Sequence, residues 1–483
     1  MDPLPTAPRI DESEAPAWDA TCDVLVVGGG CAGASAALGA AEHGAEIRIV
    51  ERAGGAGGTS AMSGGIVYLG GGTPIQQACG FEDSAEEMFR YMMAACGPHP
   101  DERLIRPYCE HSVAHFHWLV EMGVPFRPVF FEGAHEPFTS DEGLTYSGSE
   151  HVHPFREIAK PAPRGHITQQ TQNKGARLMQ ALLGRVEAAG IPIETQSRCE
   201  ALVTARDGSV VGALLATLDG RRCIRARRGV ILTAGGFIFN DTMVENHAPA
   251  LRQCKIKIGT EHDDGSGIRL GLAAGGEAIR MESGDISLIL FPPNRLREGL
   301  LVNRAGQRFI NEDAYMGRLG EFTILHQGGE AWMIVDNDSF ERPEMFPIEL
   351  AGVEESIADL EAALGMPAAA LQNTVATWNH HAQAGNDPLF GKANGYVKPL
   401  VTPPFAAIDL RAANSLYSAF TLGGLHIDAD GCVLSTAGEA IPGLYAAGRT
   451  TSGVAKQGYS SGMSLGDASF FGRRAGAHAA QRG

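Results

Sequence analysis

The first clear hydrophobic pattern is the run Asp23-Val24-Leu25-Val26-Val27, in which successive apolar, mostly β-branched residues follow one another. An unbroken run of this kind is typical of a parallel strand that is buried on both faces. A glycine-rich turn follows, then the alanine-rich stretch Ala34–His43, then a second apolar run at Glu46–Val50. The order predicts a strand, a tight turn, a helix and a second strand.

The pattern changes twice farther along the chain. From Asp83 to Gly123 it is helical, and Ser84 and Glu87 have the spacing of a capping box at its start. Between residues 194 and 235, Asp-Gly turns separate β-rich runs, which predicts a meander ending in the strand Gly229–Thr233.

Residues 284–405 have fewer glycine turns than their surroundings, and we interpret them as an inserted domain. It contains a strand at Leu300–Asn303, helices at Ser356–Leu364 and Pro367–His381, and a proline-rich exit at Pro403-Pro404. Strands near Gly424–Asp428 and Gly443–Ala447 and a helix from about Ser461 would return to the first domain. The expected division is therefore a tail at 1–21, a first domain at 22–283, the insertion at 284–405, and the rest of the first domain at 406–483.

Composition excludes several classes of protein. The 483 residues carry a net charge of −17, which disfavours nucleic acid as a partner, and the 44% hydrophobic content is too high for a disordered chain. The nine cysteines form no C-x-x-C motif, and no apolar run is long enough for a transmembrane segment. His111 and His115 share a helical face but lack further ligands, so we expect no metal. We expect a cytoplasmic protein with reduced thiols.

The glycine-rich turn carries a dinucleotide-binding fingerprint, Gly28-x-Gly30-x-x-Gly33. Glu51 ends the second strand, close to the roughly 20-residue spacing at which an acidic residue contacts the ribose hydroxyls. The turn alone could be merely a tight turn, but here strand, helix, second strand and acid follow in order. The small-residue loop Ala53–Ser60 would wrap the flavin half of FAD, which an NAD enzyme would not need.

Several further motifs resemble the succinate dehydrogenase/fumarate reductase flavoprotein superfamily. They are Gly57-Gly58-Thr59-Ser60, Ser63-Gly64-Gly65, the strand and turn at 229–236, Asp264-Gly265-Ser266-Gly267, the segment 306–312, and Gly443–Gly448. The resemblance spans roughly residues 22–480. It implies an α/β fold in which a Rossmann-like FAD-binding domain is interrupted by an α+β capping domain, with substrate between cap and flavin. The Thr59–Gly65 stretch has no histidine to link to the flavin, so we expect non-covalent FAD.

The resemblance and the fingerprint together give a set of candidate cofactor-binding residues. The Met463 and Ser464 backbone at the start of the last helix would face the pyrimidine edge of the flavin. The full set is Gly28, Gly30, Cys31, Ala32, Gly33, Glu51, Arg52, Gly58, Thr59, Ser60, Ser63, Gly64, Gly65, Ala234, Gly235, Gly448, Met463 and Ser464.

The substrate end departs from the dicarboxylate-binding members of the superfamily, which use histidine and arginine to hold carboxylates. Phe420 stands before Thr421-Leu422-Gly423-Gly424 where a histidine is expected, Tyr315-Met316 occupies the slot of the catalytic arginine, and Tyr459 replaces a clamping arginine. An apolar pocket would leave a dicarboxylate without partners. A fumarate or succinate enzyme is therefore disfavoured.

Tyrosines in these slots resemble the 3-ketosteroid dehydrogenase branch, and the block Gly458-Tyr459-Ser460-Ser461-Gly462 is most similar to the members that introduce a 4,5 double bond into 3-keto-5α-steroids. The resemblance implies catalytic roles for Tyr459, Ser461 and a cap tyrosine, matched here to Tyr315. We expect Tyr68, Phe420 and Gly462 to contact substrate. A Tyr459–Ser461 hydrogen-bonded relay would remove the proton beside the ketone, and backbone N–H groups near Gly462 would polarise the carbonyl.

The sequence thus predicts an FAD-dependent dehydrogenase acting on CH–CH groups, with a hydrophobic steroid substrate and an external electron acceptor. The alternatives are another enoate or cyclic-ketone flavin reductase, a Δ1-type ketosteroid dehydrogenase, and a flavin-binding module without this activity. In the simplest alternative for the residues, Tyr459, Tyr315 and Tyr68 pack in the core, and Ser461 caps a helix.

Overall fold

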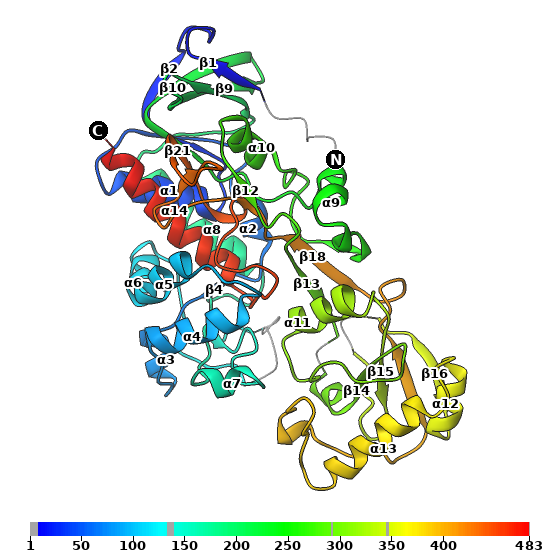
Figure 1. Ribbon diagram of the computed structural model, residues 1–483. Helices are drawn as coiled ribbons and strands as arrows, with labels where there is room; N and C mark the ends of the chain where they lie inside the picture. Colours follow the sequence, from blue (N-terminus) through cyan, green and yellow to red (C-terminus); the bar gives the residue numbers. More distant parts are fainter. Residues whose placement is uncertain (1–7, 133–139, 291–292, 344–346, 483) are drawn as a thin grey trace.

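The computed structural model describes residues 8–132, 140–290, 293–343 and 347–482, which form a large lobe and a small lobe (Figure 1). The strands β13 (Gly284–Leu288) and β18 (Tyr417–Thr421) lie side by side and connect the lobes. Within the described ranges, no helix has the length and apolar character needed to cross a membrane.

The large lobe is built on a mixed sheet. Its path runs through β1 (Arg9–Asp11), β8 (Arg198–Thr204), β9 (Val210–Thr217), β10 (Gly220–Leu232), β2 (Ala20–Val27), β3 (Ile47–Val50) and β7 (Ile193–Glu194). Strand β21 (Ala440–Ala446) joins at β10 and carries β20 (Cys432–Leu434). Strand β2 lies parallel to both β3 and β10, and its Val24, Leu25 and Val26 are fully buried. Burial on both faces explains the unbroken apolar run.

Helices cover the parallel part of this sheet. Helix α1 (Cys31–Ala41) packs on β2 and β3, and the C-terminal helix α14 (Met463–Gln481) packs on α1 and on β10 and β21. The predicted strand–turn–helix–strand unit and the β8–β9–β10 meander are confirmed. The other helices of this part are α2 (Gly58–Met62), α8 (Lys174–Ala188), α9 (Asp241–His247), η1 (Pro249–Gln253), α10 (Ser266–Ala273) and η5 (Gly448–Thr450).

The helical stretch expected between Asp83 and Gly123 is divided into α4 (Ala85–Ala95), α5 (Glu102–Glu110) and α6 (Ser112–Glu121). Gly97 has φ +88°, and Asp101 caps a new helix, so the chain cannot continue as one helix. Ser84 caps α4 by accepting the Glu87 N–H at 3.1 Å. Beside these helices lie α3 (Pro74–Ala78), α7 (Phe155–Ile158) and a sheet of β4 (Ile66–Tyr68), β6 (Gly165–Ile167) and β5 (Leu144–Thr145).

The small lobe has its own antiparallel sheet and its own hydrophobic core. The strand order is β14 (Leu300–Asn303), β15 (Ala331–Val335), β17 (Phe405–Asp409) and β16 (Leu350–Glu354), with α12 (Ile357–Ala363) and α13 (Ala370–Ala382) packed against it. Strand β17 pairs with β15 and β16, so the expected end of the insertion at residue 405 is too early. The remaining elements are η2 (Asn294–Glu298), α11 (Met316–Glu321), η3 (Phe322–His326) and η4 (Asn394–Tyr396).

Short strands flank the connection between the lobes. β11 (Ile256–Lys257) pairs with β18, and β12 (Ala278–Ile279) pairs with β19 (Gly424–Leu425). β13 and β18 pair from Gly284↔Thr421 to Leu288↔Tyr417, and all their residues are buried. The link is therefore part of the packed interior.

The expectation of a solvated tail at residues 1–21 is wrong for its described part. Residues Arg9–Asp11 form β1, which pairs in parallel with β8. Ile10, Ala15 and Trp18 pack against a small core on the meander, which gives this segment apolar area to bury. Residues 1–7 lie outside the described residues.

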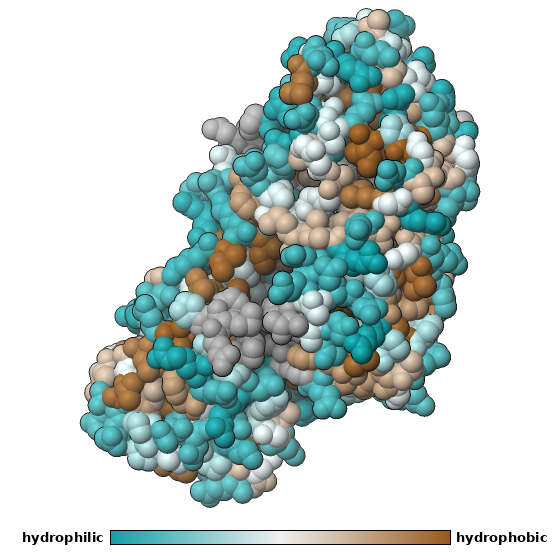
Figure 2. All heavy atoms as spheres, turned by 180° about the vertical axis from the view of Figure 1, so that it is seen from behind, coloured by the Kyte–Doolittle hydropathy of each residue, from teal (hydrophilic) through white to brown (hydrophobic). Residues whose placement is uncertain are grey.

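The surface seen in Figure 2 is mainly hydrophilic. Hydrophobic side chains are scattered over it, and some gather at the waist where the two lobes meet. The waist is also where β13 and β18 cross between the lobes in Figure 1.

Candidate active site

A cavity of about 870 Å³ connects the first turn of the nucleotide-binding unit to the strands that join the lobes. Its walls come from widely separated parts of the chain. They include Val27–Ala32, Val50–Ala53, Gly58–Ser60, Ser63, Gly64, Thr233–Gly235, Asp285, Tyr315, Met316, Phe420, Ala447–Arg449, Tyr459, Ser461, Gly462 and Ser464.

The turn between β2 and α1 has the geometry that the fingerprint requires. Gly28 has φ +111°, and a Cβ there would lie 2.5 Å from the carbonyl oxygen of Thr233 on the neighbouring strand. A Cβ on Gly33 would lie 1.9 Å from the Gly28 oxygen, so only glycine lets α1 pack this closely on the turn. Gly30 has no side chain to cap α1, and the Cys31 N–H donates to Ser60 Oγ at 3.1 Å. The remaining N–H groups of a helix N-terminus can bind phosphate.

Glu51 holds the acidic position at the end of β3. Its Oε2 accepts the Gly29 N–H at 2.8 Å and its Oε1 accepts the Ala53 N–H at 2.8 Å, so the carboxylate is fixed between the two glycine-rich loops. A carboxylate has about four acceptor positions, which leaves capacity for ribose hydroxyls.

The small-residue loop is tied to the segment before α10 through Asp263. Its Oδ2 accepts from Thr59 Oγ1 at 2.6 Å and from Arg449 Nη2 at 2.8 Å. Arg52 forms a similar pair with Asp264 at 2.6 Å. Arg449 therefore has a structural partner, and its guanidinium also lies over the Phe420 ring.

Most predicted cofactor residues line this cavity. Those that line it are Gly28, Gly30, Cys31, Ala32, Glu51, Arg52, Gly58, Thr59, Ser60, Ser63, Gly64, Ala234, Gly235, Gly448 and Ser464. Gly33, Gly65 and Met463 are not among the lining residues; Gly33 packs α1 on the turn, and the Met463 side chain is buried beside Cys96. An open helix N-terminus, a fixed carboxylate and a long glycine-lined cavity fit a dinucleotide with a flavin.

Sequence reasoning missed the part of this wall formed by Ser197–Cys199. These residues approach Glu51 because the Ser197 N–H donates to the Glu51 carbonyl at 2.8 Å. No motif marks them, because they contribute through the path of the backbone after β7.

Tyr315 and Ser461 meet at the other part of the cavity. Tyr315 Oη lies 2.8 Å from Ser461 Oγ, and both residues are buried. Tyr459 Oη accepts the Ser464 N–H at 3.1 Å, and its ring contacts Phe420 edge-on at 5.2 Å. The hydroxyl of Tyr315 is thus a neighbour of Ser461 that the sequence did not pair with it, and the Tyr459–Ser461 relay stays a prediction. The sequence could not show this because Tyr315 reaches Ser461 only through the packing of the two lobes.

The two connecting strands form one wall of this part. Asp285 and Ser287 alternate along β13 and line the cavity with Ile289. Ser418 and Phe420 line it from β18, where Ser418 is the register partner of Ser287. Ser287 Oγ donates to Asp285 Oδ2 at 2.9 Å. Asp285 thus places an acidic side chain in this wall of the cavity.

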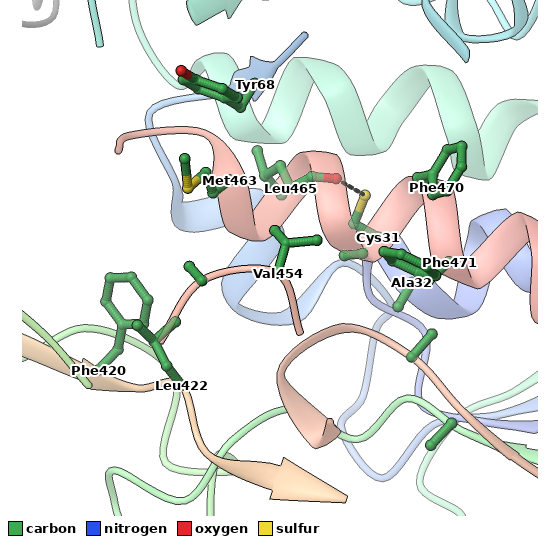
Figure 3. Packing of buried hydrophobic residues seen from close by; sticks show 14 of the residues in the cluster. Cys31, Ala32, Tyr68, Phe420, Leu422, Val454, Met463, Leu465, Phe470 and Phe471 are labelled. Carbon is green, nitrogen blue, oxygen red and sulfur yellow. Dashed lines mark hydrogen bonds between the residues drawn. The ribbon is translucent and has the colours of Figure 1, made fainter. Parts of the chain in front are cut away.

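The predicted substrate residues differ in their placement. Phe420 and Gly462 line the cavity, whereas Tyr68 does not and is fully buried. Figure 3 shows Tyr68 and Phe420 on opposite sides of the start of α14, where Leu465 approaches Cys31 of α1. Tyr68 belongs to the packed interior of β4.

A buried ion cluster supports the segment that precedes Tyr315. Arg308 contacts Glu312 at 2.8 Å and Asp387 at 2.9 Å, and Lys392 Nζ lies 2.8 Å from Glu312. The two cations lower the pKa of the buried Glu312, although desolvation opposes them. The motif at residues 306–312 is therefore a structural anchor within the small lobe.

His115 is also placed in the interior. Its Nε2 lies 2.8 Å from Ser469 Oγ of α14, and burial lowers its pKa to about 3. Among the residues that the structure describes, no group of three or more His, Cys, Asp or Glu side chains has the arrangement of a metal site.

A comparison with protein families adds to this geometry. The family model described as "FAD binding domain" matches residues 23–465. This chain belongs to that FAD-binding family. The flavoprotein therefore takes FAD as its cofactor, and the glycine-lined cavity supplies the residues to hold it.

The flavoprotein also has similar relatives. It is 31% identical to 3-oxo-5-alpha-steroid 4-dehydrogenase of Comamonas testosteroni over 89% of this chain and 93% of that protein. A probable fumarate reductase of Shewanella frigidimarina is 26% identical over 98% of this chain and 77% of that protein. The solved structure of 3-ketosteroid-delta4-(5alpha)-dehydrogenase from Rhodococcus jostii RHA1 with 4-androstene-3,17-dione is 43% identical, with a TM-score of 0.92, covering 98% of this chain and 99% of that one.

Proposed function

We propose that this flavoprotein dehydrogenates a ring ketone, introducing the 4,5 double bond into 3-keto-5α-steroids. The observation that carries the proposal is the Tyr315–Ser461 hydroxyl pair in a cavity whose nearby wall is formed by Phe420, Tyr459 and Met316. The similarity to the two steroid 4-dehydrogenases supports it. The small lobe, residues 289–416, acts as a cap over the substrate.

Different residues of the chain would bind the ketone oxygen and remove the proton from the neighbouring carbon. Tyr459 accepts an N–H from Ser464, which polarises its hydroxyl for donation to the ketone oxygen. The Tyr315–Ser461 pair takes the proton from the carbon beside the carbonyl, since a serine alone is a poor base and a tyrosine, with a pKa near 10, is closer to working range. Gly462 adds backbone to the same wall. Bound non-covalently, FAD supplies a hydride acceptor for the neighbouring carbon.

The wall composition favours a neutral, largely apolar substrate. Arg318, which stands near the slot of a catalytic arginine, is partly buried, and its guanidinium lies over the rings of Phe155 and Phe322. Arg449 is paired with Asp263. Electrons leave the flavin to an external acceptor.

Anaerobic mixing with a 3-keto-5α-steroid tests the proposal. We expect the flavin absorbance to bleach with this steroid and to remain unchanged with succinate, because Arg449, the cation beside Phe420, is already paired with Asp263. Tyr459→Phe should slow the bleaching by about 10²-fold or more. Bleaching by succinate alone would refute the proposal, and product identification fixes the position of the double bond.

A further inference from the structure

The segment Ser147–Ser149, which precedes α7 in the large lobe, contacts both hydroxyl-bearing residues of the proposed site. The Ser461 N–H donates to the Ser147 carbonyl at 2.8 Å. The Tyr315 N–H donates to the Ser149 hydroxyl at 3.1 Å. With the 2.8 Å contact between the Tyr315 and Ser461 hydroxyls, these bonds form a closed ring. The ring joins a residue of the small lobe to one of the large lobe.

Tyr91 of α4 anchors this segment from behind. Its Oη accepts the Ser149 N–H at 2.9 Å and lies 2.9 Å from Ser460 Oγ. Tyr91, Ser149 and Ser460 are all buried. One phenol oxygen thus ties the Ser147–Ser149 segment to the residue that precedes Ser461.

The contact leaves no room for a side chain at the centre of the segment. A Cβ on Gly148 would lie 2.1 Å from Ser460 Oγ and 2.6 Å from Tyr91 Oη. The separation between the Ser147 carbonyl and the Ser149 hydroxyl, and through them between Ser461 and Tyr315, is therefore set by tightly packed backbone.

Two more hydrogen bonds join the small lobe to the same part of the large lobe. Asn311 Nδ2 donates to the His153 carbonyl at 3.2 Å, and Arg156 Nη2 donates to the Gly391 carbonyl at 3.0 Å. The bond to Tyr315 is the one of these contacts that also reaches the candidate catalytic residues.

We propose that the hydroxyls of Ser149 and Tyr91 are positioning groups, which set the Tyr315–Ser461 distance when the small lobe is seated on the large lobe. This inference rests on the proposed function for its kinetic consequence. In it, Ser149 and Tyr91 do not touch the substrate; they act through Tyr315 and Ser461. A misplacement of about 1 Å at reacting groups costs up to about 10²-fold in rate. Removing either hydroxyl should therefore slow the proton-transfer step.

The kinetic test compares Ser149→Ala and Tyr91→Phe with wild-type holoenzyme. Tyr417→Phe is the matched control, because it removes another buried hydroxyl that donates at 2.6 Å to the Leu410 carbonyl. Anaerobic rapid mixing with a 3-keto-5α-steroid gives the limiting rate of flavin reduction and the dissociation constant separately. We expect both test variants to lose about tenfold or more in the limiting rate, with a dissociation constant within about threefold of wild type, and the control to keep its rate within about twofold.

An unchanged limiting rate in Ser149→Ala, or an equal loss in Tyr417→Phe, would overturn the inference. A readout without substrate separates it from the proposed function: a crystal structure of Ser149→Ala holoenzyme should show the two hydroxyl oxygens farther apart than about 3.5 Å. A retained distance of 2.8 Å would overturn the inference. If the steroid fails to reduce wild-type flavin, the proposed function fails, and the crystal structure still decides the positioning role.

Discussion

Glu51 has both carboxylate oxygens engaged by backbone donors, Gly29 on one side and Ala53 on the other. The residue therefore shapes the ribose end of the cavity as well as offering acceptors to it. An amide at this position keeps one acceptor but turns an NH₂ donor toward one of these N–H groups, which leaves a buried donor without a partner.

We predict that Glu51→Gln raises the dissociation constant for FAD by about ten- to a hundredfold, corresponding to the roughly 1.5–3 kcal/mol of hydrogen bonds to a charged group. Titration of the apoprotein with FAD, followed by flavin fluorescence, measures the change. Glu46→Gln is the control, because Glu46 is half exposed and pairs with Arg227 away from the cavity. Equal dissociation constants for the two variants would contradict this role of Glu51.

Some residues of the site could be predicted from the sequence, and others could not. The turn residues and Glu51 could be found because the fingerprint is contiguous in the sequence and its glycines are required by local geometry. Tyr315 and Ser461 could each be singled out as candidates, but their pairing depends on how the small lobe sits on the large lobe. Tyr68 was expected at the substrate, and only the direction of its side chain on β4 shows that it points into the core.

At the scale of elements, α1 and α14 pack closely because two glycines of α14 lie directly against the backbone of α1. A Cβ on Gly476 would lie 1.9 Å from the Ala36 carbonyl oxygen, and one on Gly472 would lie 2.5 Å from that of Ala32. This close approach holds the starts of both helices next to the cavity, where Cys31 and Leu465 are in contact (Figure 3).

We predict that Gly476→Ala destabilises the protein although alanine favours helices by about 1 kcal/mol over glycine, because the backbone contact cannot yield without separating the helices. Thermal unfolding of the holoprotein should show a transition lowered by several degrees. Gly184→Ala in α8 should raise it slightly, since Gly184 is exposed and a methyl group added there would have no neighbouring atom within 4 Å. A higher unfolding temperature in both variants would mean that the helix propensity of alanine outweighs the lost contact between α1 and α14.

Elements were predictable where their signals are local. The apolar run of β2, the Asp-Gly turns of the meander and the amphipathic α12 all carry such signals. The strand β1 was missed because its three residues are stabilised by β8, far along the chain, rather than by a pattern of their own. The return of the small lobe was placed too early because Pro403-Pro404 looks like an exit, whereas the chain first completes the small sheet with β17.

At the scale of the whole molecule, burial leaves several carboxyl groups in the interior without a cation that compensates them fully. Asp467 of α14 is one, and desolvation raises its pKa to about 7 although it accepts the Val454 N–H at 2.9 Å. Glu150 and Glu321 are similar, each with its pKa raised by burial to about 7.

A raised folded-state pKa gives stability that is present below the unfolded pKa, near 4, and is lost as the pH rises to about 7, because in this range the unfolded chain is ionised while the folded protein still holds the proton. We predict that Asp467→Asn, which mimics the protonated acid, loses less thermal stability than wild type between pH 5 and pH 8. The difference should be at most about 3 kcal/mol, because only about 2 pH units of the shift lie within this range, at roughly 1.4 kcal/mol each. Unfolding temperatures across this range measure it.

Asp207→Asn is the control for this prediction. Asp207 lies in an exposed turn, and its hydrogen bonds from Ser209 lower its pKa, so it titrates below the tested range. The same pH dependence in both variants and in wild type would contradict the assignment to Asp467.

The pairing of β13 with β18 determines how the small lobe could be removed from the chain. The chain leaves the large lobe after Leu288 and re-enters at Tyr417, and these two residues face each other in antiparallel register. Joining them through a two-residue turn would form an ordinary hairpin and leave every other strand of the large lobe paired as before. The coding segment of the small lobe could therefore be deleted or exchanged for another at one position in the gene. The rest of the chain would keep its fold, because a single hairpin would close the gap.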